Sequence, residues 1–159
     1  MQATASLEIG QAAPEFKLKG PGGQFVTLSE YRGRKNVVRV FYPLAFSPVC
    51  SHQLPAIEKE IARSAGLDAT VLGVSVDSHY SNTAFAERPR LSFPLLSDFK
   101  RETSAAYAVL IAEAGHSGRA IFVVAKQGKV ACRDVSPAFG DMAQIPSGDR
   151  VLAALAGLE

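Results

Sequence analysis

The stretch Asn36-Val37-Val38-Arg39-Val40-Phe41-Tyr42 decides the fold, because it is β-branched and aromatic and ends abruptly at Pro43. This composition is typical of an interior strand. A second stretch of the same character, Thr70-Val71-Leu72-Gly73-Val74-Ser75-Val76, follows a predicted helix over about residues 48–63. Strand, helix and strand in this order predict a right-handed crossover between parallel strands. The sequence therefore predicts an α/β fold.

Two further pairs of apolar segments flank this unit and predict β-hairpins. Residues 16–18 and 25–28 are separated by Gly20-Pro21-Gly22-Gly23, and residues 120–124 and 130–135 are separated by Lys126-Gln127-Gly128-Lys129. Helical segments are expected near residues 81–87, 102–107 and 148–156, with a short extended segment over 93–98. This order predicts a mixed central sheet with helices on both faces and an N-terminal β-hairpin, which is a thioredoxin-like arrangement.

Length and composition limit the classes of protein to which the chain can belong. Its 159 residues are expected to form one domain, residues 1–159, and 47% hydrophobic with 20% charged residues excludes global disorder. The 17 Lys and Arg and the 15 Asp and Glu leave a small net charge, and the basic residues are scattered, so we expect no nucleic-acid partner. Neither a signal peptide nor an apolar run of about 18 residues is visible, so we expect no membrane partner and a soluble, cytoplasmic protein.

The segment from Pro43 to Pro55 is predicted to open a helix with a reactive cysteine in its first turn. Ser47 is a good N-cap and Pro48 suits the first helical position, which places Cys50 at the third. The unsatisfied N–H groups and the positive end of the helix dipole stabilise an anion there, so the pKa of the Cys50 thiol is expected to fall. The thiolate is the nucleophilic form of cysteine.

The same helix is predicted to bury one face and to open at its start. Cys50, Leu54, Ile57 and Ile61 are spaced four, three and four residues apart, which places them on one apolar face. Pro55 cannot donate the helical hydrogen bond, so the first turn is weakly joined to the rest. We expect this turn to open locally and to expose an oxidised Cys50 to a reductant.

Each of these residues also has an ordinary structural interpretation. A lone cysteine in a small protein is more often a buried apolar side chain than a nucleophile. Ser47 taken alone is a helix cap, and Pro43 taken alone ends a strand. The combination of the three residues is what favours a reactive site.

Taken together, Pro43-x-x-x-Ser47-x-x-Cys50 resembles the active-site signature of the peroxiredoxins, Pro-x-x-x-Thr/Ser-x-x-Cys. Residues 73–77, 93–98 and 119–124 resemble the same family, and the similarity runs from about Leu7 to Leu155. The segment over residues 42–46 is most similar to the alkyl hydroperoxide reductase E-like branch of one-cysteine peroxiredoxins. The resemblance implies a thioredoxin-like fold and the reduction of hydrogen peroxide, organic hydroperoxides or peroxynitrite.

The resemblance also implies a role for each matching residue. Cys50 corresponds to the peroxidatic cysteine, Ser47 to the residue that hydrogen-bonds the peroxide, and Pro43 to the proline that shields the pocket. Arg119 occupies the position of the active-site arginine. Gln53 lies where several relatives carry a polar residue that supports the site, although a solvated helix residue needs no function.

The mechanism implied by these roles is in-line attack of the Cys50 thiolate on one peroxide oxygen, which gives a sulfenic acid and releases water or an alcohol. The expected donors to the departing oxygen are the N–H groups of Val49 and Cys50, the Ser47 hydroxyl and the Arg119 guanidinium. No metal ion and no organic cofactor is expected.

Strand direction, independently of the family resemblance, also predicts that Arg119 lies near Cys50. If the strand over residues 120–124 runs antiparallel to the strand that ends at Tyr42, its first residues lie beside the end of that strand, near Cys50. An arginine before a buried apolar run needs an anionic partner, and a thiolate is one. Without the motif, an arginine that simply reaches solvent at a strand end would be the favoured interpretation.

Cys132 is predicted to be a structural residue. It lies in the expected strand over residues 130–135, where Val130 and Cys132 should share one face of the sheet. It matches no resolving position of the two-cysteine branches of the family. The Cys50 sulfenic acid is therefore expected to be reduced by an external thiol, either a small thiol or a thioredoxin- or glutaredoxin-like protein.

Two other expectations concern metals and assembly. The histidines are too dispersed to predict a metal site: His52, His79 and His116. The family resemblance implies a homodimer.

Two other functions remain as alternatives. A disulfide reductase on the same fold is disfavoured, because the chain has no Cys-x-x-Cys pair. A non-catalytic peroxide sensor or holdase, switched by oxidation of Cys50, is supported only by the weak helical turn before Pro55. Fast and stoichiometric loss of peroxide would select the peroxidase.

Overall fold

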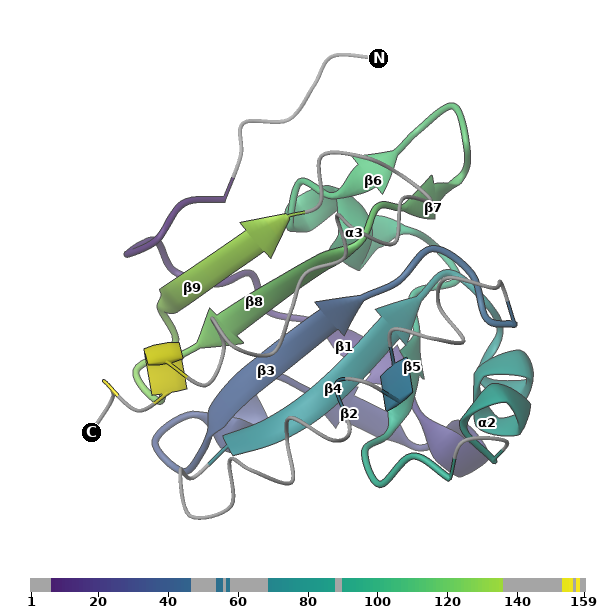
Figure 1. Cartoon of the computed structure of the whole chain (residues 1–159), viewed down its shortest axis with the longest axis horizontal. Coiled ribbons are helices and arrows are strands. Elements are labelled where there is room, and N and C mark those ends of the chain that lie inside the picture. The colour runs from purple at the N-terminus through teal and green to yellow at the C-terminus, as the bar shows by residue number, and fades with distance from the viewer. Residues whose placement is uncertain are drawn as a thin grey trace.

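The chain forms a mixed seven-stranded sheet in the order β2-β1-β5-β4-β3-β8-β9, with a separate two-stranded sheet of β6 and β7 (Figure 1). The computed structural model describes residues 7–46, 54–55, 57, 69–87, 90–135, 153–155 and 157. The strands are β1 Lys17–Lys19, β2 Phe25–Thr27, β3 Asn36–Phe41, β4 Ala69–Ser75, β5 Leu95–Ser97, β6 Leu110–Ile111, β7 His116–Ser117, β8 Ala120–Val124 and β9 Val130–Val135. The helices are η1 Pro21–Gly23, η2 Ser29–Tyr31, α2 His79–Glu87 and α3 Glu102–Ala106.

The register of the central strands confirms the predicted topology. Strand β3 pairs in parallel with β4 and antiparallel with β8, and β4 pairs in parallel with β5. Both predicted hairpins are present, as the antiparallel pairs β1–β2 and β8–β9. The result is a thioredoxin-like α/β fold, in which the carboxyl ends of β3 and β4 and the start of β8 meet at one end of the sheet.

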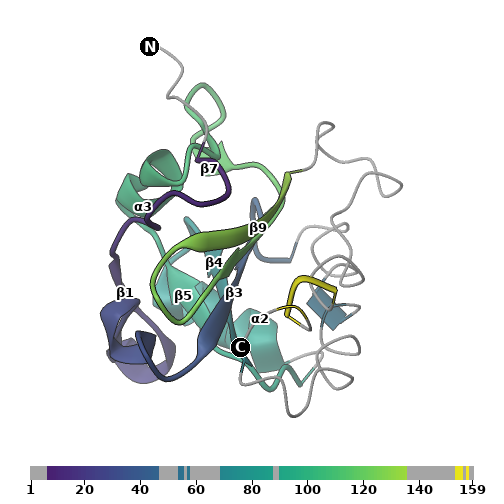
Figure 2. The same cartoon turned by 90° about the vertical axis from the view of Figure 1, so that its left-hand side faces the viewer.

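Alternate residues of β3 face two separate hydrophobic clusters, as expected for a buried strand. Val37 and Phe41 belong to the first cluster, which the N-terminal hairpin and α3 cover. Val38 and Val40 belong to the second, together with residues 54, 57, 85 and 155. Figure 2 shows the two sides, with α3 on one side of the sheet and the segment 153–155 on the other.

Arg39 is the exception on the first face of β3, because it places a charge in the core. Its side chain is fully buried, and its guanidinium has no hydrogen-bond partner among the described residues. The guanidinium carbon lies 3.5 Å from the centroid of the Phe16 ring, with the rings of Phe41 and Tyr107 at 5.3 and 5.4 Å. Burial lowers the pKa of Arg39 to about 10.

The predicted helices are confirmed where the structure describes them. The helix expected over 81–87 begins two residues earlier as α2, and the one expected over 102–107 is α3. Of the helices expected over about 48–63 and 148–156, helical backbone is described at Leu54, Pro55, Ile57 and 153–155, and the remainder lies outside the described residues. No helix in the described part of the chain is long and apolar enough to span a membrane.

The prediction that Val130 and Cys132 share a face is wrong. Val130 pairs with Val124 and packs in the first cluster, whereas Cys132 pairs with Val123 and packs against the second. A register shift between Val123 and Val124 marks a β-bulge, which adds one residue to β9 and reverses the alternation. Cys132 is half-buried on the side of the sheet that also holds Leu54.

Candidate active site

The segment after β3 forms a tight turn at the end of the sheet. Pro43 is buried, Ala45 is half-buried, and Phe46 is 44% exposed. Phe46 adopts a φ of 67°, a left-handed conformation that is uncommon for a bulky residue. Its ring packs on Phe85 of α2, with 5.1 Å between the ring centroids. The turn thus leaves β3 in a conformation that the neighbouring α2 helps to hold.

Arg119 lies at the same end of the sheet. It directly precedes Ala120, which pairs with Phe41, the last residue of β3. The hydroxyl of Ser117 donates to the carbonyl of Tyr42 at 3.3 Å, so the approach to β8 runs beside the segment that leads to the Pro43 turn. The antiparallel arrangement predicted from the sequence is therefore confirmed.

The burial of Arg119 excludes one of the two interpretations of this residue. Its side chain is only 3% exposed, so it does not simply reach solvent at a strand end. A guanidinium stays charged at neutral pH and presents a planar set of donors. A buried charge of this kind at the end of β3 is suited to stabilise an anion that forms there.

A network of polar side chains, which sequence reasoning missed, connects the turn to β4 and α2. The Tyr42 hydroxyl donates to Asn82 Oδ1, and the Ser75 hydroxyl lies 2.7 Å from Asp77 Oδ2 and 3.0 Å from Asn82 Oδ1. The N–H of Ala45 donates to the same Asp77 oxygen at 2.8 Å. The segment over residues 73–77 carried a family resemblance in the sequence, but nothing in it indicated these contacts across the fold.

The remaining predicted site residues lie outside the described part of the chain. These are Ser47, Val49, Cys50 and Gln53. The helix in which Cys50 was expected is described at Leu54 and Ile57, which are 0% and 4% exposed and lie in the second cluster. The predicted apolar face is therefore confirmed at these two positions.

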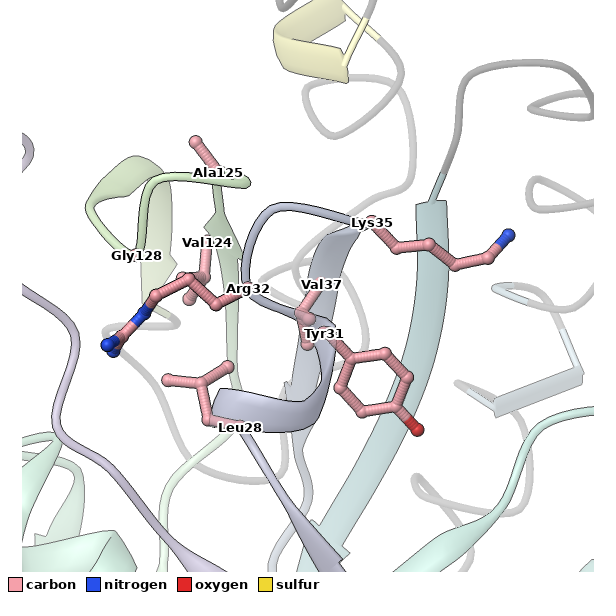
Figure 3. A pocket seen from close by; sticks show the side chains of 8 residues that line it. All are labelled: Leu28, Tyr31, Arg32, Lys35, Val37, Val124, Ala125 and Gly128. Atoms are coloured by element: carbon pink, nitrogen blue, oxygen red, sulfur yellow. The ribbon is translucent and has the colours of Figure 1, made fainter.

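Two hollows of the described surface are lined by neither the Pro43 turn nor Arg119. One is a cavity of about 10 Å³ at the opposite end of β3, between Val37 and Val124, from which Arg32 and Lys35 extend to opposite sides (Figure 3). It is barely large enough for one water molecule. The other is an open groove of about 920 Å³ between the first hairpin, α2 and α3. In the described segments, no three His, Cys, Asp or Glu side chains gather in a way that suits a metal ion.

Comparison with known proteins identifies the family. Residues 9–133 match the model of the AhpC/TSA family. The chain is 38% identical to alkyl hydroperoxide reductase E of Mycobacterium tuberculosis over 124 residues, which cover 77% of this chain and 81% of that protein. It is also 38% identical to a chloroplastic 2-cysteine peroxiredoxin of Chattonella marina over 133 residues, which cover 77% and 68% of the two chains.

Solved structures show the same fold. The reduced 2-Cys peroxiredoxin of Plasmodium vivax superposes with a TM-score of 0.81 at 30% identity, over 93% of this chain and 94% of that one. The peroxidoxin BcpB of Mycobacterium tuberculosis superposes with a TM-score of 0.84 at 27% identity, over 96% and 99%. The chain therefore belongs to the AhpC/TSA family and is a peroxiredoxin, a thiol peroxidase with a thioredoxin-like fold.

Proposed function

We propose that Cys50 is the peroxidatic cysteine and that Arg119 stabilises charge at its sulfur and at the peroxide. The observation that carries this proposal is the burial of the Arg119 guanidinium beside the end of β3, where the Pro43 turn begins. Cys50 follows Pro43 by seven residues in the sequence. A charged donor that is fixed before the reaction lowers the cost of charge development in the transition state.

The proposed step is in-line attack of the Cys50 thiolate on one peroxide oxygen. A sulfur–oxygen bond forms and the oxygen–oxygen bond breaks. The departing oxygen takes a proton to leave as water from hydrogen peroxide or as an alcohol from an organic hydroperoxide, whereas peroxynitrite releases nitrite. The sulfur is oxidised by two electrons to the sulfenic acid, and the peroxide is reduced by two. Ser47 and the N–H groups of Val49 and Cys50 donate to the peroxide, Pro43 shields the site, and Gln53 supports it. The proposed substrates are hydrogen peroxide, organic hydroperoxides and peroxynitrite.

We propose a one-cysteine cycle, in which an external small thiol or a thioredoxin- or glutaredoxin-like protein reduces the sulfenic acid. The position of Cys132 supports this cycle. Cys132 pairs with Val123, which pairs with Val38, three residues before the end of β3. Cys132 is therefore two strands away from β3 and roughly 10 Å from the end of the sheet at which the Pro43 turn lies. A disulfide requires Cα atoms within about 7 Å.

We further propose that residues 1–159 form a single domain, that the protein acts in the cytoplasm, and that it is a homodimer. Exposed aromatic rings support the dimer, because large apolar groups on a surface favour a protein partner. Three such rings line the groove between the first hairpin, α2 and α3: Phe25, Tyr80 and Phe99. Sedimentation velocity of the wild type and of a Tyr80→Glu variant tests this part, with a dimer expected for the first and a shift towards monomer for the second.

The catalytic part is tested by mass spectrometry after one equivalent of hydrogen peroxide. We expect a gain of one oxygen on Cys50 in the wild type and in Cys132→Ser, and no rapid loss of peroxide with Cys50→Ser. A loss of two hydrogens, with Cys50 and Cys132 joined, would contradict the one-cysteine cycle. Rapid turnover of peroxide by Cys50→Ser would contradict the role of Cys50 itself.

A further inference from the structure

We infer that Asp77 is a positioning residue for the peroxidase reaction, because its carboxylate fixes the turn between β3 and the segment that contains Cys50. The inference rests on the proposed role of Cys50. Asp77 Oδ2 accepts the N–H of Ala45 at 2.8 Å and the hydroxyl of Ser75 at 2.7 Å. Ala45 precedes Cys50 by five residues. A half-buried carboxylate at the carboxyl end of β4 therefore holds the backbone that leads into the nucleophile.

The turn needs such a contact, because its backbone is strained. Phe46 directly follows Ala45 and has a φ of 67°. A positive φ at a residue with a bulky side chain persists only where the surroundings enforce it. The hydrogen bond at Ala45 and the packing of the Phe46 ring on Phe85 are two such restraints, one on the backbone and one on the side chain.

Asp77 is itself fixed by hydrogen bonds to residues of the sheet, so its contact with Ala45 holds the turn in a fixed position relative to the sheet. Its N–H donates to the Ser75 hydroxyl at 3.2 Å, and its carbonyl accepts the hydroxyl of Ser97 at 2.6 Å. Ser75 also lies 3.0 Å from the amide oxygen of Asn82, which accepts the hydroxyl of Tyr42. One connected network thus contacts the chain on both sides of the buried proline, at Tyr42 before it and at the Ala45 N–H after it.

The span between fixed points on either side of Cys50 is short. The turn is fixed at Ala45 and Phe46, and Leu54 is fully buried in the second cluster. Residues 47–53 connect these points. A displacement of the turn is therefore expected to move the nucleophile, and a misplacement of about 1 Å costs reactions of this kind roughly a hundredfold in rate.

The test compares Asp77→Ala with the conservative Asp77→Asn, whose side-chain oxygen can accept the same two donors. The chain has no tryptophan, so oxidation of Cys50 is followed by rapid quenching, thiol alkylation and mass spectrometry. We expect Asp77→Ala to lower the second-order rate constant for oxidation by hydrogen peroxide roughly 10- to 100-fold. We also expect Asp77→Ala to raise the midpoint pH of Cys50 alkylation. In Asp77→Asn, both the rate constant and the alkylation midpoint should lie close to those of the wild type.

The matched control is Asp98→Ala, which removes a second carboxylate, a fully buried one, from the same end of the sheet. Asp98 accepts the N–H groups of Thr103 and Ser104 and thus fastens α3 rather than the turn. This variant is expected to lose stability while its folded form keeps the wild-type rate constant.

Should Asp77→Ala not fold, Ser75→Ala takes its place. A several-fold loss of rate is expected for this variant, because Asp77 then loses one of its two hydrogen-bond donors.

Three results would overturn the inference. The first is a folded Asp77→Ala, or in its place Ser75→Ala, with the wild-type rate constant and alkylation midpoint. The second is an equal slowing by Asp98→Ala, and the third is an Asp77→Asn variant as slow as Asp77→Ala. Peroxide turnover that survives in Cys50→Ser would instead contradict the proposed function, so the two failures are distinguishable.

Discussion

Arg39 and Arg119 are both buried in the same sheet, at 0% and 3% exposure, but their positions along the strands differ. Arg39 lies in the middle of β3 and is surrounded by the rings of Phe16, Phe41 and Tyr107. Arg119 lies immediately before β8, where the strands end and the Pro43 turn begins. The first charge is enclosed by aromatic packing in the middle of the sheet, whereas the second lies at the end of the sheet, where we propose that it acts on an anion.

We therefore expect the buried charge of Arg39 to lower the stability of the fold and the charge of Arg119 to serve the reaction. A charge buried without hydrogen bonds carries a desolvation cost of several kcal/mol, which the faces of aromatic rings offset only in part, by about 2 kcal/mol. In the proposed function, by contrast, the Arg119 charge at the end of the sheet lowers the energy of the Cys50 thiolate and of the transition state. Substitution of each arginine tests this distinction.

The largest effect is expected for Arg119→Met. Removal of a fixed donor from a developing anion typically lowers the rate roughly 10²- to 10³-fold, so we expect a loss of this size in the rate constant for oxidation of Cys50 by hydrogen peroxide. Rapid-quench kinetics with alkylation measures it, and Arg39→Met is the matched control with an expected rate close to that of the wild type. A rate for Arg119→Met within about threefold of the wild-type value would contradict the role of this residue.

The next effect has the opposite sign and concerns stability. We expect Arg39→Met to raise the free energy of unfolding by about 1–4 kcal/mol, because a long, unbranched apolar side chain replaces a buried charge that has no hydrogen-bond partner in the described part of the chain. Urea unfolding measures the change. A loss of stability would show that the contacts of the guanidinium with Phe16 and Tyr107 outweigh its desolvation.

On the other face of the sheet, close packing leaves no room for a methyl group at Gly73 of β4. A Cβ atom there would lie 2.5 Å from Leu95 Cδ2 and 3.6 Å from the Tyr42 ring. We expect Gly73→Ala to lower the free energy of unfolding by about 1–3 kcal/mol, the usual cost of overpacking. Gly118→Ala, where the nearest atom would lie 3.7 Å away, is the control and should change stability much less.

The smallest change in stability is expected for substitution of Glu15. Its carboxylate accepts hydrogen bonds from Phe16 before β1 and from Leu28 and Ser29 after β2, and so holds the two ends of the first hairpin together. Partial burial alone would raise the pKa of the Glu15 carboxyl, but hydrogen bonds from the Ser29 side chain and from the N–H groups of Phe16, Ser29 and Leu28 hold it below its ordinary value. A depressed folded pKa means that the carboxylate stabilises the fold above the ordinary pKa, and that this contribution is lost as the pH falls through the folded value.

Because Glu15 is exposed, Glu15→Gln is expected to cost less than about 1 kcal/mol at neutral pH. The difference in unfolding free energy between variant and wild type should shrink as the pH falls below 4.5, the ordinary value of the carboxyl. Urea unfolding at several pH values measures it, with Glu113→Gln as an exposed control. A difference that grows in acid would show that the charge of Glu15 does not act through these hydrogen bonds.

Much of the fold could be predicted from the sequence, because its central strands are long and strongly β-forming. Strands β3, β4, β8 and β9 and their pairing follow from runs of β-branched residues and from turn residues between them. Strands β6 and β7 have two residues each and show no usable alternation. The bulge in β9 depends on pairing with β8, so local pattern alone could not place Cys132 on its face.

The candidate site was predictable only in part, because some of its contacts join segments that are distant in the sequence. The position of Arg119 follows from strand direction, which the sequence indicates. The contact of Asp77 with Ala45 joins residues 32 positions apart and depends on how two loops meet after the sheet has formed. Arg39 looked like one residue of an interior strand, and only the packed structure shows that its charge is enclosed by aromatic rings.

The most direct test of the central claim is the pH dependence of Cys50 alkylation, measured by mass spectrometry in the wild-type protein. If the buried guanidinium and a helix N-terminus act on this sulfur, the midpoint lies below neutral pH and rises in Arg119→Met but not in Arg39→Met. A wild-type midpoint near that of an ordinary thiol, roughly pH 8.5, would contradict the account.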